Sequence, residues 1–276
     1  MAFVQISQRL IRTVACAALA AAAMGAAQVS ANTISYSTTN PNTGVSLLKS
    51  EKMKFGTNSA GSVSAGALWA TESPSNSSFW VYCLDPLVSA HSPTAETPYG
   101  LTAFLGSSSY FGAAAYANVG SVYVKQNATT VQNNLVELYS HAYNDSLTSK
   151  TKSAAFQYAI WEILGETEAN FGTDVGGLKA NTYVGNSDSA FRAQADAYLS
   201  ALNATGNEAA VWGAVNGFNL SAAQNFTYTV YTPNTTGSSQ AFLGVVASTL
   251  TSTNGVPEPG TGALAAMGAL AWFGAR

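Results

Sequence analysis

SAAFQYAIWEILGE, residues 153–166, is the stretch around which the rest of the chain can be organised. Its apolar positions recur at the spacing of one face of an α-helix. That face comprises Ala154, Gln157, Ile160, Trp161 and Leu164. A buried carboxamide without hydrogen-bond partners costs about 1–3 kcal/mol. We therefore expect a helix ending near Gly165 in which Gln157 is either fully hydrogen-bonded or chemically converted to a group without N–H donors.

The composition of the 276-residue chain favours an exported, strand-rich protein. Charged residues make up 9% of the sequence, and the net charge is −3 without a basic cluster. Nucleic-acid binding is therefore not expected, because phosphates require clustered lysine and arginine. The middle of the chain is rich in serine, threonine, asparagine, glycine and tyrosine. This is more typical of a secreted or surface protein than of a cytoplasmic enzyme.

Residues 1–31 have the pattern of a secretory signal peptide. Arg9 and Arg12 supply the positive start, and residues 14–27 form an apolar, alanine-rich run. The small residues at 29–31 are typical of a cleavage site. We therefore expect export, with the mature chain beginning directly after this segment.

Export would leave Cys83 as the only cysteine of the mature chain, because Cys16 lies in the signal segment. The residues before Cys16 lack the leucine and the apolar run of a lipoprotein acylation site. A lone cysteine in an oxidising compartment cannot form an intramolecular disulfide. Cys83 is then a buried inert thiol, an intermolecular bridge, a nucleophile or half of another covalent bond.

The expected elements follow the order strands, helices, strands. Strands are expected on both sides of a turn at 40–44 within residues 32–57, and at 79–84, 226–231 and 240–247. Besides the helix at 153–166, helices are expected at 111–123, 131–143 and 189–202. Loops are expected at 71–78, 88–98 and 172–185. This order predicts an α+β fold over residues 32–253, with a β-sandwich or barrel-like framework and a helical insertion. An N-terminal signal peptide and a C-terminal hydrophobic anchor are expected to flank it.

Residues 254–276 form a separate tail. Pro257, Glu258 and Pro259 precede an apolar run at 262–274, which is shorter than the about 20 residues that span a bilayer. The tail resembles the PEP-CTERM sorting signal, and an ordinary apolar tail is the alternative. The resemblance implies an exosortase-type partner, a membrane anchor and export to the outer surface or exopolysaccharide matrix of a Gram-negative bacterium.

Two short motifs carry a second resemblance. Tyr82-Cys83-Leu84-Asp85 ends an expected strand, and Phe156-Gln157-Tyr158-Ala159-Ile160-Trp161 lies on the central helix. Together they resemble the thioester domains of bacterial surface adhesins, although Phe156 stands where that family has threonine. The resemblance implies an internal thioester between Cys83 and Gln157.

The expected chemistry is acyl transfer without turnover. The Cys83 thiolate would attack the Gln157 side-chain carbonyl and expel ammonia. Tyr82, Tyr158 and Trp161 are expected to shield the bond from water until an amine or hydroxyl of an extracellular protein or polysaccharide attacks it. Such a protein is an adhesin rather than an enzyme, and it needs no cofactor.

Two alternatives remain open. A cysteine hydrolase would combine Cys83 with His141 or His91 as the base and Asp145 as the orienting acid. A non-covalent structural matrix protein or glycan-binding module would use Cys83 only as a buried side chain. Two histidines and one mature cysteine make a zinc site unexpected.

Overall fold

The computed structural model describes residues 32–56, 59–86, 88, 97–104, 110–111, 127–180, 188–204, 211–214, 224–234 and 239–247. The predicted signal peptide at 1–31 and the sorting segment at 254–276, including Pro257, Glu258 and Pro259, lie outside these residues, as does His91. Within the described residues, no helix is long and apolar enough to cross a bilayer.

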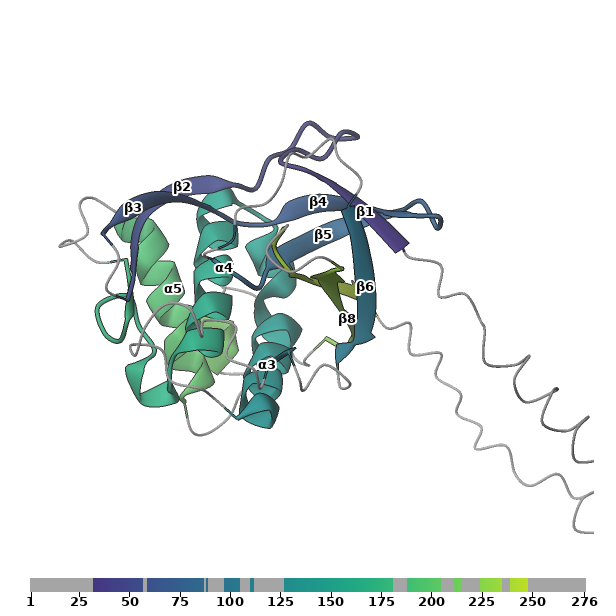
Figure 1. Ribbon diagram of the computed structural model, residues 1–276. Helices are drawn as coiled ribbons and strands as arrows, with labels where there is room; N and C mark the ends of the chain where they lie inside the picture. The colour runs from purple at the N-terminus through teal and green to yellow at the C-terminus, as the bar shows by residue number, and fades with distance from the viewer. Residues whose placement is uncertain are drawn as a thin grey trace, which may run out of the picture.

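A closed antiparallel barrel forms one half of the fold (Figure 1). Its strands are β1 (Asn32–Ser37), β4 (Leu68–Ser73), β5 (Ser77–Cys83), β6 (Thr97–Ala103), β8 (Phe226–Pro233) and β9 (Phe242–Ala247). They follow the order β1-β4-β5-β9-β8-β6 around the barrel. The predicted barrel-like framework is therefore confirmed, with a barrel rather than a sandwich.

In the described part of the chain, the helices α3 (Ala128–Ser146), α4 (Lys150–Gly165) and α5 (Ser189–Leu202) and a small sheet form the other half (Figure 1). A 3₁₀ turn, η2 (Glu168–Asn170), follows α4. The sheet has the order β3-β2-β7, from β3 (Gly61–Ala65), β2 (Lys49–Phe55) and β7 (Leu178–Lys179). All three helices fall between β6 and β8 in the chain, as expected for a helical insertion in a β framework.

Each helix begins at a residue whose side chain caps the first turn. Asn127 accepts a hydrogen bond from the Thr129 N–H, Ser149 from Lys152, and Asp188 from Ala190. Such caps satisfy N–H groups that have no partner inside the helix. The three caps explain why the helices begin where they do, including α3, which extends beyond the predicted 131–143.

Helix α4 is the centre of the molecule and is buried on every side, from Ser153 to Gly165. The prediction of a single apolar face is too narrow. In Figure 1, α4 lies between α3 and α5, with β2 and β3 running across its end. These neighbours cover the positions that a surface helix would expose to water. Gln157 is completely buried, as the sequence predicted.

Several predicted segments differ from the structure. The expected loop at 71–78 is part of the β4–β5 hairpin, in which the Thr71 and Ser78 hydroxyls are 2.8 Å apart across the strands. Strand β6 begins at Thr97, inside the expected 88–98 loop, and β7 lies inside the expected 172–185 loop. In each case, pairing with another strand gives regular structure to a segment rich in turn-forming residues. Of the helix expected at 111–123, only Phe111 is described, and it is helical.

Candidate functional site

Cys83 is the last residue of β5, at a point where the barrel is paired on only one side. The Leu84 N–H donates to Ala241 O (2.8 Å), so residue 84 faces β9. Adjacent residues of a strand direct their N–H and C=O groups to opposite sides. The Cys83 backbone groups therefore face β4, whose paired residues begin with Leu68, opposite Val81.

Gln157 occupies the place of the missing strand partner. The Cys83 N–H donates to Gln157 Oε1 (2.8 Å), and Gln157 Nε2 donates to Cys83 O (2.7 Å). The carboxamide thus binds the same residue through both of its ends, as a paired strand residue would. The structure brings together the two side-chain positions of the predicted thioester, which lie in different elements.

This arrangement decides one of the questions that the sequence raised. Gln157 is stabilised as an amide, because its oxygen and its nitrogen both have a backbone partner. Burial of the carboxamide is therefore not itself a reason for chemical conversion. The two hydrogen bonds instead fix the carboxamide beside the Cys83 backbone.

Ser153 provides a second contact of the same kind, one helical turn before Gln157. Its Oγ accepts a hydrogen bond from the Ala67 N–H (2.9 Å) and lies 3.2 Å from the Tyr82 hydroxyl. Gly66, just before Ala67, has φ +130°, and a Cβ there would lie 2.3 Å from Leu47 O. Ser153 and Gln157 thus join α4 to the start of β4 and the end of β5, and only glycine fits at this junction.

The Cys83 thiol is free and buried. Burial raises the pKa of the Cys83 thiol well above its usual value, and the nearby Asp85 raises it further. Burial also raises the pKa of Tyr99 to about 12, with smaller contributions from Tyr36 and Cys83. Cys83 is therefore a neutral thiol at physiological pH, and any attack by its sulfur must include loss of the thiol proton.

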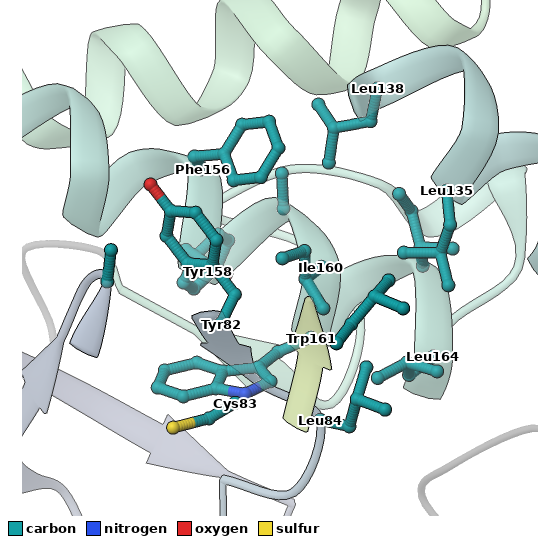
Figure 2. Close-up of a cluster of buried hydrophobic side chains, with 14 of the residues drawn as sticks. Tyr82, Cys83, Leu84, Leu135, Leu138, Phe156, Tyr158, Ile160, Trp161 and Leu164 are labelled. Atoms are coloured by element: carbon teal, nitrogen blue, oxygen red, sulfur yellow. The ribbon is translucent and has the colours of Figure 1, made fainter. Parts of the chain in front are cut away.

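The three residues expected to shield a thioester have different surroundings. Tyr82 points to the opposite face of β5 from Cys83, and its hydroxyl lies 2.7 Å from Ser146 Oγ. The Tyr158 hydroxyl donates to Leu178 O (3.2 Å). Trp161 lies one helical turn after Gln157, on the same face of α4, and Figure 2 shows it in the same buried cluster as Cys83. Shielding stays a prediction for all three residues.

The residues expected for a cysteine hydrolase are engaged elsewhere. Asp145 binds Lys152 Nζ (2.5 Å) and accepts a hydrogen bond from the Tyr198 hydroxyl (2.9 Å). The His141 ring stacks on Trp212 with ring centroids 5.1 Å apart. Among the residues that the structure describes, no group of three or more His, Cys, Asp or Glu side chains is arranged to hold a metal ion.

Two features of the site were not predicted from the sequence. Ser153 lies four residues before Gln157, so the helical period would have placed it on the same face. Glu162 is completely buried, and neither of its carboxylate oxygens has a hydrogen-bond partner among the described residues. Burial raises the pKa of Glu162 well above its usual value. Nothing in the sequence marks this glutamate as buried.

No family model and no curated protein matches this sequence. Solved structures similar to it include the N-terminal thioester domain of a surface protein from Clostridium perfringens, with 15% identity, a TM-score of 0.37, and 65% of this chain and 89% of that chain covered. A cysteine-to-alanine mutant of that domain has 15% identity and a TM-score of 0.38, with coverage of 66% and 88%.

The N-terminal thioester domain of the fibronectin-binding protein SfbI from Streptococcus pyogenes is also similar. It has 12% identity and a TM-score of 0.39, with 66% of this chain and 84% of that chain covered. These neighbours are of the class that the sequence motifs resemble. At these identities and TM-scores, we base no functional assignment on the similarity.

Proposed function

We propose that this chain is an exported adhesion protein in which Cys83 and Gln157 form an internal thioester that captures a nucleophile on an extracellular target. The observation that carries the proposal is the pair of hydrogen bonds between the Gln157 carboxamide and the Cys83 backbone, at 2.8 and 2.7 Å. They hold the acyl carbon of one residue beside the residue that bears the thiol.

Bond formation joins Cys83 Sγ to the Gln157 side-chain carbonyl carbon and breaks the bond from that carbon to Nε2. The thiol proton leaves with the nitrogen as ammonia. The hydrogen bond from Nε2 to Cys83 O is lost, whereas Oε1 can keep its bond from the Cys83 N–H. Attack by a target amine then gives an amide to residue 157, and the proton released by the amine restores the thiol.

The raised pKa of Cys83 opposes both steps unless a proton moves with the sulfur. A thiol that resists ionisation is a poor nucleophile, and its anion is a poor leaving group, so the thiol proton must be lost during bond formation and regained when the amine attacks. Burial also keeps water from the bond, because Cys83 is 7% exposed and Gln157 is 0% exposed. The site therefore suits a bond that is used once and protected until then.

The proposed setting is the outer surface or extracellular matrix of a Gram-negative bacterium. Residues 1–31 would direct export, and the sorting signal at Pro257, Glu258 and Pro259 would be recognised by exosortase-type machinery. The apolar run after it would anchor the chain in the membrane, either transiently or permanently. The proposed target bears an amine or a hydroxyl, on a protein or a polysaccharide.

Intact mass measurement of the mature protein tests the thioester. We expect the wild-type mass to fall short of the sequence mass by one ammonia, and methylamine to add its full mass while releasing one titratable thiol. Cys83→Ala should have the full mass of its sequence and should not react with methylamine. Cys83→Ser is a matched control, because serine keeps the size of the side chain and replaces the thiol by a hydroxyl. A wild type of full mass, with a thiol that titrates in the unfolded protein, would contradict the proposal.

The second candidate is a non-covalent matrix or glycan-binding protein. It is favoured by the same hydrogen bonds, because Gln157 is already satisfied as an amide and does not require conversion. In that case, Cys83 is a small buried side chain that completes the barrel. Binding to isolated matrix that is unchanged in Cys83→Ala, together with a full wild-type mass, would favour this candidate.

A further inference from the structure

Trp161 carries a buried hydrogen-bond donor that the fold does not use. The side chain is 2% exposed, and its indole Nε1 has no hydrogen-bond partner among the described residues. An unpaired buried donor costs about 1–3 kcal/mol. The indole lies in the hydrophobic core, where it makes an edge contact with Phe55 at a ring-centroid distance of 6.0 Å.

The position of this donor points to the Cys83–Gln157 pair. Trp161 follows Gln157 by one turn of α4, so the two side chains leave the same face of the helix. Gln157 reaches the backbone of Cys83 from that face. Figure 2 shows Trp161 and Cys83 in the same buried cluster, with the nitrogen-bearing edge of the indole turned toward Cys83 in this view.

We propose that the Trp161 N–H and the Cys83 N–H together form an oxyanion hole for the side-chain carbonyl oxygen of Gln157. The inference rests on the proposed thioester function and assigns Trp161 a catalytic role in it. The Cys83 N–H already binds that oxygen at 2.8 Å. The Trp161 N–H is the second donor, and it is left without a partner in the amide form.

The role follows from the charge that develops in both acyl-transfer steps. When the Cys83 sulfur attacks the amide, or when a target amine attacks the thioester, the carbonyl carbon becomes tetrahedral. The electron pair of its double bond then moves to the oxygen. Collapse returns that pair and expels ammonia in the first step and the Cys83 thiolate in the second. A donor that gains its partner only as this charge forms lowers the barrier without stabilising the ground state.

The test replaces the N–H group and keeps the shape of the side chain. In the mature protein, Trp161 is replaced by benzothienylalanine, in which sulfur stands for the N–H group, and Trp161→Phe is made in parallel. The matched control is Trp212→Phe, since Trp212 is equally buried and its Nε1 donates to Glu137 Oε1 (3.3 Å). Thermal unfolding confirms that each variant folds, and intact mass follows the reaction with methylamine over time.

We expect the benzothienylalanine variant to react with methylamine on the order of 100-fold more slowly than the wild type, with the same final yield of adduct. A folded variant that has not formed the thioester also supports the proposal, because bond formation passes through the same oxyanion. Trp212→Phe should react at the wild-type rate. A wild-type rate in the benzothienylalanine variant overturns the role of Trp161 and leaves the thioester intact. A wild type without the ammonia deficit overturns the proposed function, and this inference with it.

Discussion

Two regions of α4 hold buried polar side chains in different ways. On the face toward β4 and β5, Ser153 and Gln157 bind backbone groups of Ala67 and Cys83 that have no strand partner. On the face toward the loop before β7, Glu162 is equally buried, but neither of its carboxylate oxygens has a partner in good hydrogen-bond geometry among the described residues, although the Tyr158 hydroxyl and the Gly172 backbone lie near it.

The difference shows what a polar group inside a helix core contributes. Where the barrel leaves strand N–H and C=O groups unpaired, a side chain from α4 completes the pairing, and both partners gain from burial. At Glu162, burial disfavours the charged form and raises the pKa, and the nearby Tyr158 hydroxyl and Gly172 backbone offset this only in part. Burial of Glu162 therefore carries an energetic cost that the hydrogen bonds of Ser153 and Gln157 avoid.

Replacing Gln157 gives the largest expected effect. Gln157→Leu keeps the approximate volume but leaves the Cys83 N–H and C=O buried without partners, so the free energy of unfolding should fall by about 3–5 kcal/mol. Urea unfolding of each variant measures it. The matched control is Gln132→Leu, because Gln132 is also buried but donates one hydrogen bond, to Phe104 O (2.7 Å).

We expect the control to lose about 1–2 kcal/mol. Equal losses in the two variants would mean that the Cys83 backbone finds another partner. The strand-facing side of α4 would then differ less from the loop-facing side than the hydrogen bonds indicate.

The junction at Gly66 gives the next largest effect. In Gly66→Ala, the new Cβ would lie 2.3 Å from Leu47 O, at a φ of +130° that side chains rarely adopt. The backbone must shift, and with it the Ala67 N–H that binds Ser153. We expect a loss of about 2–4 kcal/mol in the free energy of unfolding.

Gly61→Ala is the control for this change, because a Cβ at Gly61 meets no atom within 4 Å. Its unfolding free energy should stay within about 0.5 kcal/mol of wild type. If Gly66→Ala is as stable as Gly61→Ala, the backbone between Leu47 and Ala67 can shift at little cost. The contact between α4 and β4 then does not fix the position of the helix.

The sequence predicted the central helix and the meeting of Cys83 with Gln157 better than it predicted the barrel. A long apolar run with an inserted glutamine has a strong helical period. The resemblance of its motif to thioester domains pairs this glutamine with a cysteine. Strands β3 and β4 were missed because residues 61–73 are mainly small or polar, with Val63, Leu68 and Trp69 as the large apolar residues, and such a segment forms strands only when it is paired. The burial of Glu162 was also beyond prediction, because it depends on α5 and the loop before β7, which pack against α4 from distant parts of the chain.

The loop-facing side gives the smallest expected effect, and its sign depends on pH. Because the pKa of Glu162 is raised in the folded state, the folded protein binds more protons than the unfolded protein above the usual glutamate value of about 4.3. Stability contributed by the neutral acid is therefore present at low pH and falls as pH rises toward the folded pKa. In Glu162→Gln, this dependence is absent. The decrease in unfolding free energy between pH 4.5 and pH 8 should be smaller than in wild type by about 1–2 kcal/mol.

The matched control for Glu162→Gln is the same change at an exposed glutamate. Glu168 lies in η2 near the end of α4 and is exposed, so Glu168→Gln should keep the wild-type dependence on pH. Urea unfolding at the two pH values measures both variants. If Glu162→Gln also keeps the wild-type dependence, the carboxyl is solvated or paired in solution. The indole N–H of Trp161 would then be the only buried polar group of α4 without a hydrogen-bond partner among the described residues.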